Sequence, residues 1–155
     1  MAEFNTVEQS HNDKDALFAT GVKPKMVRAT VTITNGTSAS GDVIRLVKGL
    51  PFAAKVVGIL VPKAISAIAG LTDVDFGFYK TNKGSAIDAD ILVNGLDPHS
   101  GLSVGELIGD NAYKTVAEHL SKNNDQEYVG GVDLAITLNA TPSASGTLTF
   151  WIFLA

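Results

Sequence analysis

Apolar and polar residues alternate in several separate parts of this chain. From residue 26 to 34, valine, alanine and isoleucine alternate with arginine and threonine. A period of two is typical of a half-buried antiparallel strand. The same period returns near the C-terminus, and shorter apolar runs lie between. The pattern predicts six strands, at residues 26–34, 42–47, 56–61, 71–80, 132–139 and 147–155.

Two segments between the predicted strands have the features of short helices. Residues 86–93 follow a serine placed three positions before an aspartate and are followed by an Asn-Gly pair, which are a weak start and a weak stop signal. In residues 111–122, apolar residues recur at i, i+3, i+4 and i+7. That spacing predicts a two-turn helix with one apolar stripe.

Two loops end in the same four residues, Ser-Ala-Ser-Gly, at positions 38–41 and 143–146. Each loop joins two predicted strands that carry threonine. The similar turn chemistry predicts two β-hairpins and not a repeat protein. A further turn is expected at residues 81–84.

These elements predict one all-β domain over residues 26–155. We expect an antiparallel β-sandwich, of which the jelly roll is one topology, with one or two short helices. The chain has 155 residues, which is enough for one sizeable core. The expected core is Val31, Ile33, Ile44, Leu46, Val57, Ile59, Val61, Val74, Phe76, Phe78, Leu134, Ile136, Leu138, Leu148, Phe150 and Ile152.

The last predicted strand differs from the others because both of its faces become apolar. Phe150 and Ile152 continue the inward face, while Trp151 and Phe153 lie on the opposite face. Apolar residues on both faces indicate a strand that is covered on both sides. A loop or helix of the same chain or a neighbouring subunit can supply the cover. Trp151 and Phe153 are therefore candidate interface residues.

The first 25 residues are polar and show little periodicity. We interpret residues 1–25 as an N-terminal arm, either solvated or ordered on a partner. Its apolar residues would then be further interface candidates: Phe4, Val7, Leu17 and Phe18. The arm has no apolar segment of the kind found in signal peptides.

Composition excludes several classes of function. The formal net charge of −4, with no run of lysine or arginine, argues against nucleic acid as a partner. There is no cysteine, so disulfides and thiolate metal sites are absent. The apolar segment 50–71 contains two lysines and two prolines, which favours a buried strand over a membrane span.

No catalytic arrangement is evident. Asp97, His99 and Ser100 are the residue types of a hydrolytic triad, but they are adjacent on one expected loop. His11 and His119 have no metal-ligand spacing, and we expect all three histidines to be solvated or structural. We therefore expect no enzyme activity and no cofactor.

Four aspartates offer a minor alternative, a structural calcium site. Asp73 and Asp75 share one face of a predicted strand, and Asp88 and Asp90 follow after a turn. Four carboxylates could form an oxygen-rich site for Ca²⁺, although the spacing is not that of an EF-hand. Aspartates at alternate positions are also what the outward face of a strand contains, and this is the favoured interpretation.

Two segments resemble small virion proteins of tailed bacteriophages: residues 71–92, with Asp-Val-Asp-Phe-Gly-Phe-Tyr followed by Ile-Asp-Ala-Asp-Ile-Leu, and the ending from residue 128. The chain looks like a capsid decoration (cement) protein or another head-associated structural protein. This resemblance implies a β-sandwich or jelly roll that forms a homo-oligomer, often a trimer. Its partner would be the major capsid protein lattice. Its location would be the outer capsid surface, after assembly in the host cytoplasm, where it would stabilise the shell.

An alternative virion role stays open at this stage. A tail- or fibre-associated structural protein, or one that binds a host glycan, would have a similar all-β sequence. Glycan binding would favour exposed aromatic residues in a cleft, and the chain has a single tryptophan and three tyrosines. Neither alternative requires a catalytic residue.

Overall fold

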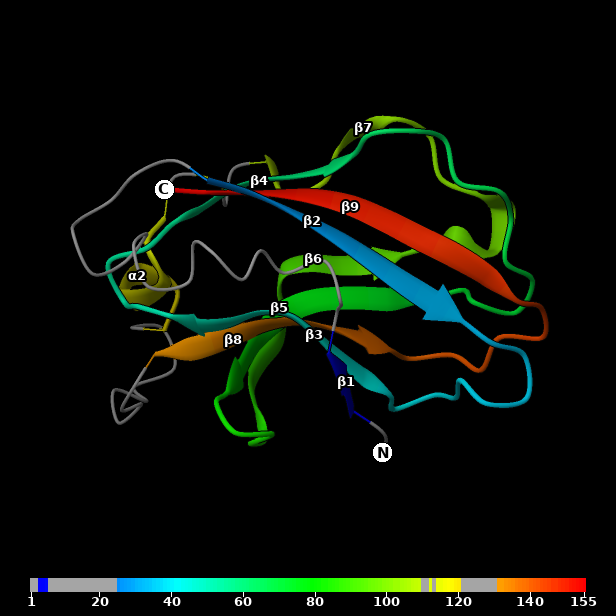
Figure 1. Ribbon diagram of the computed structural model, residues 1–155, viewed down its shortest axis with the longest axis horizontal. Helices are drawn as coiled ribbons and strands as arrows, with labels where there is room; N and C mark the ends of the chain where they lie inside the picture. Colours follow the sequence, from blue (N-terminus) through cyan, green and yellow to red (C-terminus); the bar gives the residue numbers. More distant parts are fainter. Residues whose placement is uncertain (1–2, 6–24, 110–111, 113, 121–130) are drawn as a thin grey trace.

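The computed structural model describes residues 3–5, 25–109, 112, 114–120 and 131–155. In this part of the chain, two β-sheets pack face to face (Figure 1). The four-stranded sheet has the order β2-β9-β4-β7 and is antiparallel throughout. Its strands are β2 (Lys25–Ile33), β9 (Gly146–Leu154), β4 (Val56–Val61) and β7 (Gly105–Glu106).

The second sheet has five strands in the order β1-β3-β8-β5-β6. All its neighbours are antiparallel except β1, which pairs parallel to β3. Its strands are β1 (Glu3–Asn5), β3 (Val43–Leu50), β8 (Val132–Leu138), β5 (Val74–Lys80) and β6 (Ala86–Leu96). Two short helices complete the described part, a 3-10 turn η1 (Pro98–Ser100) and α2 (Val116–Leu120).

The order of the strands is that of an eight-stranded jelly roll. When β1 is set aside, the orders β2-β9-β4-β7 and β3-β8-β5-β6 arise because most consecutive strands change sheet. This double Greek-key arrangement confirms the expected all-β sandwich and selects the jelly-roll topology within it. Among the described residues, no helix is long and apolar enough to span a membrane.

The two loops with the shared Ser-Ala-Ser-Gly ending do not form hairpins, contrary to the prediction. Each joins strands of different sheets, β2 to β3 and β8 to β9. The loops lie beside each other, since the Asn35 backbone N–H donates to Ser145 Oγ at 2.9 Å and that of Ser40 donates to Thr141 Oγ1 at 3.1 Å. These hydrogen bonds join the two loops at one end of the sandwich.

The core between the sheets agrees with the sequence pattern at all but one predicted position. The other predicted core residues are buried, and Phe76 meets Phe150 edge to face across the sheets, with ring centroids 5.0 Å apart. Val57 is 37% exposed, and Val56 is buried in its place. The register of β4 against β9 shifts between Val56 and Gly58, so a bulge turns the Val57 side chain outward.

The predicted helix at 86–93 is wrong, because these residues belong to β6. β5 and β6 form a hairpin around the predicted turn at 81–84. Val93 lies opposite Phe76, but Asp88 lies opposite Phe78, so β6 has extra residues that bulge away from the ladder. The second predicted helix, 111–122, is represented by the five residues of α2, with Val116 and Leu120 in the core.

Candidate interaction surfaces

The outer face of the four-stranded sheet carries the aromatic residues that the sequence singled out. In β9, Phe150 and Ile152 are fully buried between the sheets, whereas Trp151 and Phe153 are half-buried on the outer face. The strand is thus apolar on both faces, as predicted. Its inner face is fully covered, whereas its outer face is covered only in part.

Residues of all four strands form one row across this outer face, which we call the Trp151 row. Arg28 of β2 pairs with Trp151, Trp151 pairs with Leu60 of β4, and Leu60 pairs with Glu106 of β7. Directly paired residues of antiparallel strands point to the same side of a sheet. The row therefore runs from a cation through two apolar side chains to an anion, with Arg28 and Glu106 exposed.

A second row beside it is apolar. Met26 pairs with Phe153, and Phe153 pairs with Gly58. A Cβ on Gly58 would lie 3.2 Å from Phe153 Cδ2, so the glycine leaves the space that the phenyl ring covers. Met26 is 45% exposed. With Val57, the two rows make the surface that we call the outer apolar face.

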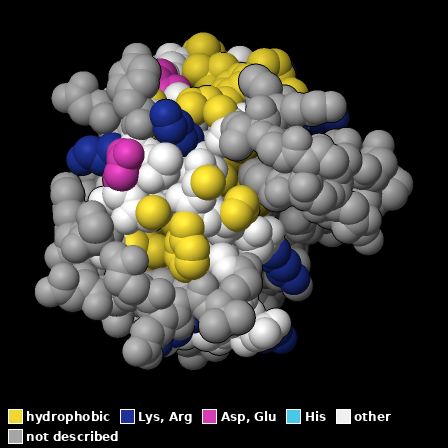
Figure 2. All heavy atoms as spheres, turned by 90° about the vertical axis from the view of Figure 1, so that its left-hand side faces the viewer, with side chains coloured by type: hydrophobic (Ala, Val, Ile, Leu, Met, Phe, Trp, Pro, Cys, Tyr) yellow, Lys and Arg dark blue, Asp and Glu magenta, His cyan; other side chains and the backbone are white. Residues whose placement is uncertain are grey.

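Figure 2 views the end of the molecule at which β9 terminates. Hydrophobic side chains gather there in two places, and the upper group lies at the level of the four-stranded sheet, which is uppermost in both views. Exposed apolar area of this kind is typical of surfaces that bind another protein.

The arm residues proposed as interface candidates are described only in part. Phe4 is the middle residue of β1 and pairs with Ile44 of β3. The start of the predicted arm is therefore a strand at the edge of the five-stranded sheet. Val7, Leu17 and Phe18 lie outside the described residues.

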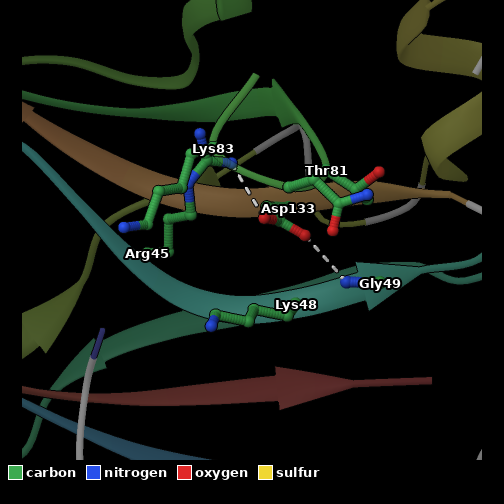
Figure 3. Close-up of a pocket in the computed structure, with 7 residues that line it drawn as sticks. Arg45, Lys48, Gly49, Thr81, Lys83 and Asp133 are labelled. Atoms are coloured by element: carbon green, nitrogen blue, oxygen red, sulfur yellow. Dashed lines mark hydrogen bonds and ion pairs between the residues drawn. The ribbon is translucent and has the colours of Figure 1, made fainter. Parts of the chain in front are cut away.

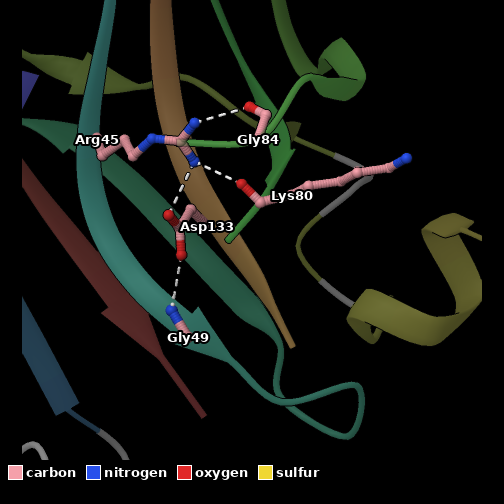
Figure 4. A network of polar contacts seen from close by, with 5 residues as sticks. All are labelled: Arg45, Gly49, Lys80, Gly84 and Asp133. Carbon is pink, nitrogen blue, oxygen red and sulfur yellow. Dashed lines mark hydrogen bonds and ion pairs between the residues drawn. The ribbon is translucent and has the colours of Figure 1, made fainter. Parts of the chain in front are cut away.

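An ion pair between Arg45 and Asp133 is buried on the outer side of the five-stranded sheet. Arg45 NH1 donates to Asp133 Oδ2 at 2.8 Å, and the two side chains are 1% and 3% exposed. The same guanidinium donates to the carbonyl oxygens of Lys80 and Gly84, both at 2.8 Å (Figure 4). Its Cζ atom lies 5.5 Å from the centroid of the Tyr79 ring. The sequence did not predict this network, because only Ile44 and Leu46 of this strand were assigned to the core.

The network holds two exposed loops in place. Asp133 Oδ1 accepts a hydrogen bond from the Gly49 backbone N–H at 2.9 Å, which fixes a bulge in β3. The bonds from Arg45 fix both sides of the turn between β5 and β6. A cavity of about 480 Å³ lies between these two loops (Figure 3).

Of the four aspartates considered for a calcium site, Asp75 and Asp90 accept hydrogen bonds from other groups of the protein. Asp75 accepts hydrogen bonds from the Gly95 backbone N–H at 2.7 Å and from Asn139 Nδ2 at 2.6 Å. Asp90 accepts one from Asn94 Nδ2 at 3.1 Å. Within the part of the chain that the structure describes, no three His, Cys, Asp or Glu residues are grouped so as to hold a metal ion.

The acidic neighbours of Asp90 nevertheless affect its pKa. A hydrogen bond with the Asp88 side chain, followed by partial burial and the negative charges of Asp88 and Asp75, raises the pKa of Asp90 above its ordinary value of 3.8. Protonated Asp90 can thus donate a hydrogen bond to the Asp88 carboxylate, whereas ionised Asp90 is repelled by it.

Two residues of the apparent triad, Asp97 and His99, make hydrogen bonds that hold local structure. Asp97 accepts a hydrogen bond from the His99 backbone N–H at 2.9 Å and so caps η1. His99 Nδ1 accepts one from the Gly70 backbone N–H at 2.9 Å and thereby joins two loops. His119 is buried in α2, with its ring 5.6 Å from that of Phe78, and His11 lies outside the described residues.

The fold is a jelly-roll domain with apolar and aromatic side chains on the outer face of its four-stranded sheet. No family model, no curated protein and no solved structure matches the chain. Its function must therefore be inferred from its own residues.

Proposed function

We propose that this chain is a non-enzymatic structural protein that associates with further copies of itself through the outer apolar face. The observation that carries the proposal is the Trp151 row, in which an aromatic and an aliphatic side chain lie between an exposed Arg28 and an exposed Glu106. Trp, Met, Phe and Arg are the residue types enriched at the centres of protein interfaces.

The charge pattern of this row favours a second copy as the occupant. When two such sheets face each other about a two-fold axis parallel to the strands, the row of one copy meets the reversed row of the other. Arg28 then faces the Glu106 of the second copy on both sides, while Trp151 and Leu60 pack in the centre. An isologous interface requires this kind of self-complementarity. A two-fold pair of this kind is a dimer, so it competes with the trimer that the resemblance implies, and a mass measurement decides between the two.

The more specific proposal is a capsid decoration protein of a tailed bacteriophage. The segments that resemble virion proteins and the jelly roll, a fold that recurs in viral capsid domains, support it. Fold alone does not fix function. In this role the oligomer would bind the outer surface of the major capsid protein lattice, with no nucleic acid or membrane partner.

The glycan-binding alternative receives less support from the surface. The two cavities described, one near Arg45 and one between Lys63 and Thr149, have no aromatic residue in their linings. Trp151 lies on a sheet face and not in either cavity. Sugar recognition usually relies on aromatic rings within a concave site, so assembly is the better-supported use of Trp151.

The first test is the solution mass of the full chain by light scattering on a sizing column. We expect a closed oligomer for the wild-type chain and a monomer for Trp151→Ser. Trp151→Phe, which keeps an apolar ring, is the matched control and should retain the oligomeric mass. Circular dichroism identifies any variant that has simply failed to fold.

A monomeric wild-type chain at micromolar concentration would overturn the proposed self-association. The virion assignment is tested separately, by immunogold labelling of intact phage particles with an antibody against the chain. Labelled heads support the decoration role, labelled tails favour the tail alternative, and unlabelled particles contradict both. A chain that lacks residues 1–20 also lacks β1, so circular dichroism must first show that the rest of the sandwich still folds. A folded chain of this kind should lose attachment to heads if the arm makes contacts there.

A further inference from the structure

The cavity beside the Arg45–Asp133 pair has a distinctive set of charges. It occupies about 480 Å³, and its lining includes the side chains of Lys48, Lys83, Thr81 and Asn82. Figure 3 shows Lys48 on one side of Asp133 and Lys83 on the other. The Lys48 side comes from β3 and the Lys83 side from the turn between β5 and β6.

The carboxylate in this cavity does not contribute a free negative charge. One oxygen of Asp133 accepts from Arg45 and the other from the Gly49 backbone N–H. Arg45 balances its charge, so the two exposed lysines set the net charge of the cavity at +2. Thr81 and Asn82 add uncharged hydrogen-bond donors at the same rim.

The buried network holds the backbone beside both lysines. Lys48 lies in the β3 bulge, next to Gly49, whose φ is 69° and whose N–H is held by Asp133. Lys83 has φ of 60° in a tight turn, a conformation that is uncommon for residues other than glycine. Arg45 holds that turn through the Gly84 carbonyl oxygen. A buried ion pair of this kind is a costly way to gain stability but an effective way to fix geometry.

We propose that this cavity is a binding site for an oxyanion, a phosphate or carboxylate group, held between Lys48 and Lys83. Two ammonium groups on opposite sides of a cleft can each donate to a different oxygen of one anionic group, and such charge-assisted hydrogen bonds are the stronger ones. The preformed loops lower the entropy that binding would otherwise cost. The proposal is independent of the self-association through the outer apolar face, which lies on the other sheet.

The group could be a free phosphate or a carboxylate on a partner protein, and the test has an arm for each. The amide resonances of Gly49, Lys83 and Gly84 are followed by NMR in the full chain. Inorganic phosphate is titrated in one arm and a tetraglutamate peptide in the other, with sodium chloride at equal ionic strength as the reference. We expect saturable shifts in at least one arm and none with chloride.

Three variants make the result specific. Lys48→Gln and Lys83→Asn should each weaken binding at least ~10-fold, as expected when a hydrogen bond to a charged group is lost. Asparagine is chosen at position 83 because it tolerates positive φ. Lys63→Gln, an exposed lysine outside this cavity, should leave binding unchanged.

Saturation by phosphate alone identifies a free phosphate as the ligand, and saturation by the peptide alone identifies carboxylates of a partner chain. Either result supports the site. The absence of saturable shifts in both arms would overturn it. An equal loss in Lys63→Gln would overturn it too, because overall charge and not this cavity would then be responsible.

Discussion

At the scale of single residues, the Arg45–Asp133 pair links the bulge in β3 to the turn between β5 and β6. Asp133→Ala leaves the guanidinium buried without its counter-ion and frees the Gly49 N–H. Removal of one partner of a buried ion pair typically costs 3–5 kcal/mol, so we expect the free energy of unfolding to fall by about that amount. Urea denaturation followed by circular dichroism measures the change.

The matched control for this variant is Asp97→Ala. Asp97 also accepts a single backbone N–H, but it is exposed and caps only the short turn η1. Loss of such a cap costs about 1 kcal/mol. If both variants lowered the free energy of unfolding by the same small amount, the buried ion pair would not stabilise the fold as proposed.

Asp90 leads to a prediction about pH. Because its pKa in the folded chain is raised by Asp88, burial and Asp75, protonation of Asp90 favours folding. The stabilising contribution is present below the ordinary pKa of 3.8 and is lost as pH rises through the higher folded pKa. Asp90→Asn should therefore stabilise the chain slightly at neutral pH, by less than about 0.5 kcal/mol for an exposed residue.

The test for Asp90 is a comparison of unfolding free energies of wild type and variant between about pH 3.5 and pH 7. The gain from Asp90→Asn should shrink as pH falls, since wild-type Asp90 becomes neutral as well. A gain that does not depend on pH would contradict the proposed repulsion by Asp88 and Asp75.

The same scale shows how far alternation alone identifies buried residues. Val31 and Ile33 are buried as a period of two predicts. Val57 is not, because the bulge in β4 reverses the pattern for one residue. A bulge depends on how two strands pair and leaves no mark in the residues of one strand. The burial of Arg45 also depends on a remote strand, because its partner Asp133 lies 88 positions away. The pattern of one strand therefore does not predict it.

At the scale of elements, the bulge of β6 over β5 depends on a glycine. A Cβ at Gly77 would overlap the backbone at Asp88 and Ala89. Ala89 in turn packs against the buried group formed by Val43, Tyr79 and Ala135. Gly77→Ala should therefore displace β6 and cost roughly 1–3 kcal/mol, as overpacking usually does.

Gly105→Ala is the control for that change, since a Cβ there meets nothing within 4 Å and Gly105 has no positive φ. It should leave the unfolding free energy nearly unchanged. Thermal or urea denaturation of both variants separates the two cases. Equal stability of Gly77→Ala and wild type would mean that β6 does not lie this close to β5.

The element scale also explains why β6 was predicted as a helix. Its signals were Ser85 before Asp88 and the Asn94-Gly95 pair, which are local preferences of a few tenths to one kcal/mol. Pairing with β5 and burial of Leu92 outweigh them. The two predicted hairpins failed for a related reason, since turn composition cannot tell a hairpin from a loop that crosses between sheets.

At the scale of the whole molecule, the jelly-roll order brings together strands that are remote in sequence. The Trp151 row takes one residue each from β2, β9, β4 and β7. The sequence identified Trp151 and Phe153 because aromatic residues on the outer face of a strand are unusual in themselves. It could not identify Arg28, Leu60 or Glu106 as their neighbours, because these positions become adjacent only through strand order and register.

The charges at the two ends of that row provide the sharpest test of self-association. Arg28→Glu alone, or Glu106→Arg alone, would place like charges opposite each other in a face-to-face pair and should weaken the oligomer. The double variant Arg28→Glu with Glu106→Arg restores opposite charges across a two-fold interface. We expect light scattering to show a lower mass for each single variant and a recovered mass for the double one.

The recovery is what makes this test specific, because a merely local role of either residue gives no reason for the two changes to compensate. Arg28 and Glu106 lie at opposite edges of the four-stranded sheet, separated by β9 and β4. A direct ion pair within one chain is thus not the source of any rescue. Glu106 also accepts a hydrogen bond from the Ile108 backbone N–H at 2.7 Å, so Glu106→Gln, which keeps an acceptor, is the control for that local contact. If the double variant were folded and still weaker than both single ones, the two-fold arrangement would be wrong, and the Trp151 row would have to face a different protein.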